Sequence, residues 1–439
     1  MRSCSTLVKG TLILTATGIL SRLIGFAYRI FLAGQLGGEG MGIYQLIFPI
    51  YAICHSVGIS GIQTALSKLC AEHTAKNDYR GARQLLFIGL ALSVGVSILI
   101  GLCVIQLSDF YSIQILQEPR CSKLLRIMAL ALPFSAVHSC INGYYYGLKK
   151  TAIPSISQLL EQCARVGSVM ILFSISETVS VESMTAVAVI GLVIGECAAT
   201  LLSITAYLWC HEENKTEGSL HHGLRQILLL SLPLAANRGV LNIIQNVETA
   251  LIPTKLRDFG LSNSEALSVY GTLTGMAMPF ILFPNTLFNS IAVLLLPSIA
   301  EAQAQADYAL IYRYTKKNTL ACVGLGVLST LCFLIFGPFI GNLVFHSELA
   351  GSFLITLAWI CPFLYLTTTL GSILNGLGKT HVTFLHNVAG LAIRIVFIIM
   401  AIPTYGIKGY LWGLLISELA ITVLHMDSIQ RFLKTPSQA

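Results

Sequence analysis

Apolar blocks of about 20 residues, separated by short polar segments, dominate this chain. A helix of that length crosses the hydrocarbon core of a bilayer, which is about 30 Å thick. The pattern predicts an all-α polytopic membrane protein with about twelve transmembrane helices. In the first half we place these helices at residues 11–34, 42–66, 85–107, 124–147, 152–176 and 184–209. In the second half we place them at 227–253, 267–297, 318–345, 352–375, 381–403 and 406–426.

The longest clearly polar connector, HEENKTEGSLHHGLRQ at 211–226, divides the chain near its middle. We therefore predict an N-terminal six-helix lobe at 1–210, a cytoplasmic linker at 211–226 and a C-terminal six-helix lobe at 227–439. The first apolar block has no cleavage site of the signal-peptide kind and contains Arg22 and Arg29, so we expect it to be a retained helix.

Composition and charge agree with this class and add an orientation. Hydrophobic residues make up 55% of the chain and charged residues only 11%, too few to cover a water-facing surface. With the N-terminus inside, sixteen Lys and Arg residues fall in inner segments and five in outer ones, a strong positive-inside bias. We predict that both termini lie in the cytoplasm and that the net charge of +7 reflects cytoplasmic loops, with no nucleic-acid partner.

An internal repeat supports two similar halves in the same orientation. With a shift of 229 residues, Asp78-Tyr79 falls on Asp307-Tyr308 and Arg165 falls on Arg394. A shift of 222 pairs Glu196 with Glu418, and a shift of 216 pairs Ser21-Arg22 with Asn237-Arg238. Because each half has an even number of spans, the two copies share one orientation, as in transporters with two parallel lobes.

Polar residues inside the predicted spans indicate the candidate binding site. Arg22 and Arg29 are two helical turns apart and share one face of the first helix. Charged groups are costly in hydrocarbon, so we expect them to line a hydrated cavity that suits an anionic substrate. The predicted substrate-binding residues of this central cavity are Arg22, Arg29, Arg238, Asn242 and Gln245. Snorkelling toward the interface is the alternative for these arginines, above all for Arg29.

Other intramembrane polar residues have both a structural and a functional interpretation. Helix 152–176 carries a polar stripe with helical spacing, in which Glu161 and Arg165 are able to pair. Architectural pairing within each lobe is favoured for Arg165, Arg394, Glu196 and Glu418. Glu248 is a candidate for ion coupling, whereas His55, His138 and His386 are lone histidines that suit either a core or a proton-relay role. The predicted stripe within the lobes comprises Gln158, Glu161, Gln162, Arg165 and Arg394.

The chain lacks the sequence motifs of nucleotide hydrolysis, serine hydrolysis and zinc proteolysis. Its twelve cysteines form no CxxC pair, and we predict no metal site. We therefore expect a carrier rather than an enzyme. A coupling cation, Na+ or H+, and the membrane potential are the open alternatives for its driving force.

Three segments give the chain a family resemblance. KGTLILTATGILSRLIGFAYRI, GGEGMGIYQLIFPIY and NGYYYGLKKTAIPSISQLLEQCARV resemble the polysaccharide-exporter branch of the multidrug/oligosaccharidyl-lipid/polysaccharide (MOP) flippase superfamily. The stage V sporulation protein B group is the most similar, and the lipid II flippases of the MurJ type are more distant relatives. The resemblance covers nearly the whole chain and implies a MATE-like fold.

The resemblance also implies a function. A flippase of this kind moves an undecaprenyl-phosphate-linked sugar or a peptidoglycan precursor across the bacterial cytoplasmic membrane, which in the sporulation group serves spore cortex peptidoglycan. Such a protein works in the lipid bilayer, and cell-wall synthesis proteins are its expected partners. Arg22 matches a cavity arginine of the MurJ relatives, whereas Arg29 departs from their spacing by one residue. A cation-coupled multidrug exporter of the MATE type is the alternative.

Overall fold

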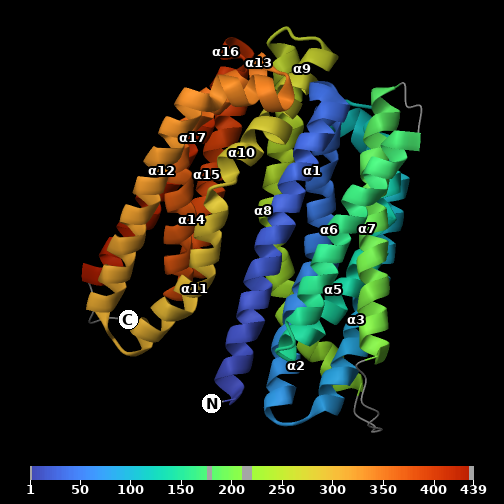
Figure 1. The fold of residues 1–439 in the computed structure, drawn as a ribbon, viewed down its shortest axis with the longest axis vertical. Coiled ribbons are helices and arrows are strands. Elements are labelled where there is room, and N and C mark those ends of the chain that lie inside the picture. Colours follow the sequence, from blue (N-terminus) through green and yellow to red (C-terminus); the bar gives the residue numbers. More distant parts are fainter. Residues whose placement is uncertain (1, 176–179, 210–219, 435–439) are drawn as a thin grey trace. The chain divides into compact units, whose positions relative to one another are not determined.

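The computed structural model describes residues 2–175, 180–209 and 220–434, and these residues are helical with short connections and no strands (Figure 1). They form two compact units: unit 1 lies within Met1–Leu36 and Ile43–Asn246, and unit 2 within Gly37–Gly42 and Val247–Ala439. Each unit is described by itself.

Unit 1 is a bundle of long helices whose core lies between α2, α3, α5 and the start of α8. Leu66 and Leu86 are fully buried there, and Ile227 of α8 joins the same cluster. The elements of unit 1 are α1 (Arg2–His55), η1 (Ser56–Ser60), α2 (Gly61–Ala75), α3 (Tyr79–Phe110), η2 (Tyr111–Ile115), α4 (Cys121–Ala129), α5 (Ala131–Gly147), α6 (Ala152–Ile175), α7 (Val181–Trp209) and α8 (Leu220–Asp258) as far as Asn246.

Unit 2 has its core around α13 and α14, where Leu357, Tyr365 and Leu370 are fully buried. A bend of 58° separates these two helices. The elements of unit 2 are the end of α8, α9 (Asn263–Gly271), η3 (Thr272–Ala277), α10 (Met278–Leu282), α11 (Asn285–Ala304), α12 (Tyr308–Phe345), α13 (Glu348–Ala358), α14 (Cys361–Gly376), α15 (Thr380–Met400), α16 (Ile402–Tyr405) and α17 (Ile407–Lys434).

The helices have the length and apolar surface of membrane spans. Within the described residues, eight helical stretches can cross a bilayer, and up to nine if the bent pair α13–α14 is one span. Large apolar side chains such as Leu99, Leu102 and Phe110 are exposed along α3, as expected where lipid replaces water. The protein is thus a multi-pass α-helical membrane protein, whereas the number of about twelve spans stays a prediction.

The first of these stretches, Ala16–Ala75, is 60 residues long and far exceeds one bilayer crossing. It is broken at Gly37, whose φ of 63° and ψ of −171° are not helical. Two predicted spans, 11–34 and 42–66, flank this glycine. A residue without a Cβ atom adopts such a positive φ at little cost, which explains a glycine at the break.

The lobe boundary inferred from the sequence differs from the packing of the chain. Contacts place residues 227–246 in unit 1, because the first part of α8 packs against α1 and α2, and unit 2 begins at Val247. The Cβ position of Gly61, for example, lies 2.7 Å from the carbonyl oxygen of Ser231 on α8. The predicted linker at 211–226 lies largely outside the described residues, and the lobes at 1–210 and 227–439 stay a prediction.

The internal repeat appears in the backbone of the two units. With the shift of 229, the left-handed residues Asn77, Gln117 and Lys149 fall on Ala306, His346 and Gly378, which also have positive φ. With the shift of 216, the π-helical turn η1 falls on η3, both starting from equivalent positions. Equivalent residues thus form equivalent connections and equivalent helix distortions.

Asp78 and its repeat partner Asp307 are the N-cap residues of α3 and α12. Asp78 therefore provides a test of one repeated element. Its carboxylate accepts a hydrogen bond from the Gly81 backbone at 2.9 Å, as Asp307 does from Leu310 at 2.8 Å. The Gly81 amide, and after it the His73 side chain, lower the pKa of Asp78 below its ordinary value. The stabilisation is therefore complete above the unfolded pKa of about 3.9 and is lost as the pH falls through the folded pKa.

We predict that Asp78→Ala lowers the free energy of unfolding by about 1 kcal/mol at neutral pH, because it removes an N-cap. The difference from the wild type shrinks as the pH is lowered through the pKa of Asp78. Thermal unfolding in detergent at several pH values measures both effects, with Glu72→Ala as the control for charge removal. A difference that grows toward acidic pH would contradict the cap assignment.

The glycines that follow the break allow a close helix contact inside unit 2. The Cβ position of Gly42 lies 2.2 Å from the Leu267 carbonyl oxygen, and that of Gly271 lies 2.1 Å from the Gly38 carbonyl oxygen. Glycines at the contact between two helices let their backbones approach directly within a membrane. We predict that Gly42→Ala destabilises the protein by about 1–3 kcal/mol, as in other overpacked contacts.

Melting of purified protein in detergent measures this loss. Gly34→Ala is the matched control, because nothing lies within 4 Å of its Cβ position. Equal melting temperatures for Gly42→Ala and Gly34→Ala would show that the contact does not constrain the fold.

Candidate functional site

The residues of the predicted cavity all lie in unit 1. Arg22 and Arg29 on α1 and Arg238 on α8 are exposed, although they lie in predicted spans. Leaving a guanidinium in hydrocarbon costs roughly 2.5–3.5 kcal/mol on insertion scales. Three such groups therefore favour a hydrated or polar surrounding. The sequence placed Arg238 in the other lobe, but the packing of α8 brings it into the same unit as Arg22.

The polar residues of α8 divide between two faces. Asn242 donates a hydrogen bond to the Ala52 carbonyl oxygen at 3.1 Å, and Asn246 accepts one from the Tyr111 hydroxyl. These two amides fasten α8 to its neighbours in unit 1. Arg238 and Gln245, seven residues apart, share an exposed face. Of the predicted α8 residues, Asn242 thus makes a contact within the protein, whereas Arg238 and Gln245 remain available to a ligand.

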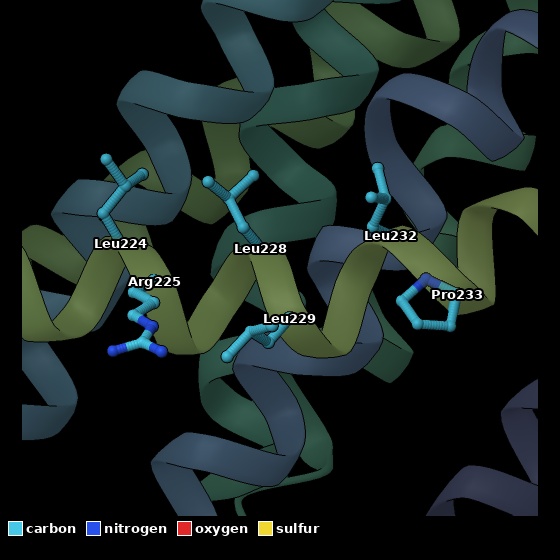
Figure 2. A pocket seen from close by; sticks show the side chains of 6 residues that line it. All are labelled: Leu224, Arg225, Leu228, Leu229, Leu232 and Pro233. Atoms are coloured by element: carbon cyan, nitrogen blue, oxygen red, sulfur yellow. The ribbon is translucent and has the colours of Figure 1, made fainter.

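The start of α8 carries an apolar pocket of about 410 Å³ (Figure 2). Figure 2 shows the leucine side chains along the helix and the guanidinium of Arg225 at one end of the strip. Such a surface suits an acyl or prenyl chain, and the arginine suits an acidic head group. The pocket is lined by Leu224, Arg225, Leu228, Leu229, Leu232 and Pro233.

A buried charge cluster, here called the Arg165 cluster, joins four helices of unit 1. It consists of Arg165 and Glu161 on α6, Glu196 on α7, His138 on α5 and Tyr51 on α1. Arg165 pairs with Glu161 at 2.5 Å, and the Tyr51 hydroxyl donates to Glu196 at 2.9 Å. His138 Nδ1 lies 3.2 Å from the second carboxylate oxygen of Glu196. One ligand atom each from His138, Glu161 and Glu196 lie within 4.8 Å of one another, close enough to share a small cation.

A glycine makes this cluster possible. The Cβ position of Gly195 on α7 lies 3.0 Å from the Glu161 carbonyl oxygen and 3.2 Å from Cβ of Arg165. A larger residue there would push α7 away from α6. The small residue one position before Glu196 thus brings that carboxylate close to the polar stripe of α6.

Unit 2 contains a corresponding Arg394 cluster. Arg394 on α15 pairs with Glu418 on α17 at 2.6 Å and lies 3.8 Å from Glu248 on α8. The Tyr410 hydroxyl donates to Glu248 at 2.8 Å, and the Thr367 hydroxyl donates to Glu418 at 3.0 Å. The arginines and the carboxylates of Glu196 and Glu418 are repeat partners, so the expected pairing inside each half is present for Arg394 and Glu418.

The structure also shows where the remaining predicted residues lie. Glu248 is 6% exposed and points into the Arg394 cluster of unit 2. Gln158 is exposed, and Gln162 lies next to α1, with its amide oxygen 4.0 Å from the Cβ position of Gly25. His138 is not a lone histidine, because Glu196 faces it. The repeat contained this signal, since the shift of 229 places His138 on Thr367, which contacts Glu418.

Comparisons with known proteins identify the family and the fold of this chain. The family described as polysaccharide biosynthesis protein matches residues 7–303. Stage V sporulation protein B of Bacillus subtilis is 25% identical over 98% of this chain and 84% of its own length. Lipid II flippase MurJ of the same organism is 23% identical over 89% of this chain and 76% of its own length.

Solved structures show the same fold. An inward-facing multidrug resistance MATE transporter of the MOP superfamily has a TM-score of 0.75 at 14% identity and covers 98% of this chain and 100% of its own. Lipid II flippase MurJ in an inward closed conformation has a TM-score of 0.69 at 17% identity, with 97% and 90% covered. The fold is thus the one that membrane transporters of the MOP superfamily have. The chain belongs to the polysaccharide biosynthesis protein family.

Proposed function

We propose that this protein is a flippase that moves an anionic, undecaprenyl-phosphate-linked sugar or peptidoglycan precursor across the bacterial cytoplasmic membrane. It works by alternating access, with both termini in the cytoplasm. The observation that supports this proposal is the exposure of Arg22, Arg29 and Arg238 within apolar spans. Guanidinium groups bind phosphate oxygens with paired, charge-assisted hydrogen bonds, so a diphosphate is a suitable guest.

The two surfaces of α8 match the two chemical parts of such a substrate. The exposed Arg238 and Gln245 suit the phosphate and sugar groups, and the apolar pocket beside Arg225 suits part of a prenyl chain. The names of two relatives, lipid II flippase and stage V sporulation protein, favour a lipid II-like cargo that serves spore cortex peptidoglycan. Cell-wall synthesis proteins are the partners that such a cargo implies.

A cation-coupled multidrug exporter of the MATE type is the alternative, because MATE transporters share the fold. A binding site for cationic drugs favours carboxylates, whereas the predicted first span, 11–34, contains two arginines and no acidic residue. Glu248, the candidate for ion coupling, is buried against Tyr410 and Arg394. These observations favour an anionic cargo.

Binding of lipid II to the full-length protein in nanodiscs tests the proposal. We predict that Arg22→Ala combined with Arg238→Ala weakens binding about 100-fold, because each charge-assisted hydrogen bond contributes roughly 1.5 kcal/mol or more. The matched control is Arg126→Ala combined with Arg431→Ala, which removes two exposed arginines paired with Asp109 and Asp427. The control should bind as tightly as the wild type.

Unchanged binding in the Arg22 and Arg238 variant would remove the basis of the proposal. Absence of lipid II binding, together with drug resistance on expression that Glu248→Gln abolishes, would support the exporter instead. Flipping of a fluorescent lipid II analogue in proteoliposomes then separates transport from binding alone.

A further inference from the structure

The Arg165 cluster holds an unbalanced charge inside the protein. In their ordinary states, Glu161 and Glu196 contribute two negative charges and Arg165 contributes one positive charge. Glu196 is 5% exposed, and the side chains of Glu161 and Arg165 are each 14% exposed. An uncompensated charge in such surroundings is costly. The cluster therefore favours one additional positive charge.

Two buried polar atoms that lack a hydrogen-bond partner lie where that positive charge would be. Nδ1 of His138 and Oε2 of Glu196 are buried and make no hydrogen bond with good geometry, although they are 3.2 Å apart. His138 is 8% exposed. A proton on Nδ1 would turn this contact into a charge-assisted hydrogen bond and satisfy both atoms.

The chemistry of the side chains selects a proton over a metal ion. An imidazole nitrogen is a poor ligand for an alkali cation, and a divalent ion would leave a net positive charge beside Arg165. One proton neutralises the cluster. The charged and titratable groups that face His138 are Tyr51 and His55 of α1, Glu161 and Arg165 of α6, and Glu196 of α7.

The Arg394 cluster differs from the Arg165 cluster at the position that His138 occupies. It also has two carboxylates, Glu248 and Glu418, around one arginine. At the place of His138 it has Thr367, whose hydroxyl donates to Glu418 and cannot take up a proton at ordinary pH. Of the two repeated clusters, only the one in unit 1 thus has a histidine beside its paired carboxylate.

A short chain of groups connects this cluster to the exposed arginine of α8. Asn242, one helical turn after Arg238 on α8, donates to the carbonyl oxygen of Ala52, and His55 lies one turn after Tyr51 on the same helix α1. Its ring is 6.0 Å from that of Tyr51, which donates to Glu196. A positive charge gained at His138 therefore acts in the same direction as Arg238 on an anion bound there.

We propose that His138, together with Glu196 and Glu161, binds one proton whose uptake is coupled to binding of the anionic substrate at Arg238. This inference rests on the proposed function and names the coupling ion. Because coupling is reciprocal, substrate binding draws a proton onto the cluster, and a lower pH tightens substrate binding.

Calorimetry of lipid II binding to the full-length protein in nanodiscs tests the coupling. The measurement is repeated in buffers of different ionisation enthalpy, and the slope of the heat against that enthalpy counts the protons taken up. We expect up to one proton in the wild type and affinity that is several-fold higher at the lower pH. His138→Gln and, separately, Glu196→Gln should lose both effects. His386→Gln, which changes a histidine of unit 2, should retain them.

Proton uptake that persists in a folded His138→Gln protein overturns the inference, as does lipid II binding by the wild type without proton uptake. His138-dependent binding of Zn2+ or Na+ in place of proton uptake overturns it too. If the wild type does not bind lipid II, the proposed function fails. Infrared pH-difference spectra of the purified protein then decide the proton site separately, since His138→Gln must remove an imidazole band that His386→Gln leaves in place.

Discussion

The cost of a charged group in an apolar, membrane-spanning bundle governs the arrangement of this protein. Arginines in such helices have two solutions, and both occur here. Arg165 and Arg394 are paired with carboxylates inside their units. Arg22, Arg29 and Arg238 lie at exposed positions of their helices. The first solution fixes helices to one another, and the second requires water, lipid head groups or an anionic ligand.

Much of this could be predicted from the sequence, because hydropathy and repeats are local or periodic signals. The membrane class follows from apolar length, and the pairing of Glu161 with Arg165 follows from their i, i+4 spacing. The repeat pairs Asp78 with Asp307, and the structure shows both residues as N-caps. Residues that contact neighbours one turn away are thus the ones that sequence reasoning locates well.

The remaining contacts depend on which helices pack together, which no periodicity encodes. Glu248 reaches Arg394 because the end of α8 joins unit 2, while the start of the same helix, with Ile227 and Asn242, packs in unit 1. Because this single helix contributes residues to both units, the boundary between the units does not fall at a polar linker. The contact of His138 with Glu196 likewise depends on the packing of α5 against α7.

The two halves keep one architecture but differ in the residues that can change charge. The position of Glu161 in the first half is occupied by Gly390 in the second, and the position of His138 by Thr367. In unit 2 the second carboxylate is that of Glu248 on another helix, α8. The Arg394 cluster therefore has a charge similar to that of the Arg165 cluster. Each cluster thus has two carboxylates around one arginine, although the first has a histidine where the second has a threonine. Of the two clusters, the one with a histidine beside its carboxylate lies in the unit that carries Arg22, Arg29 and Arg238.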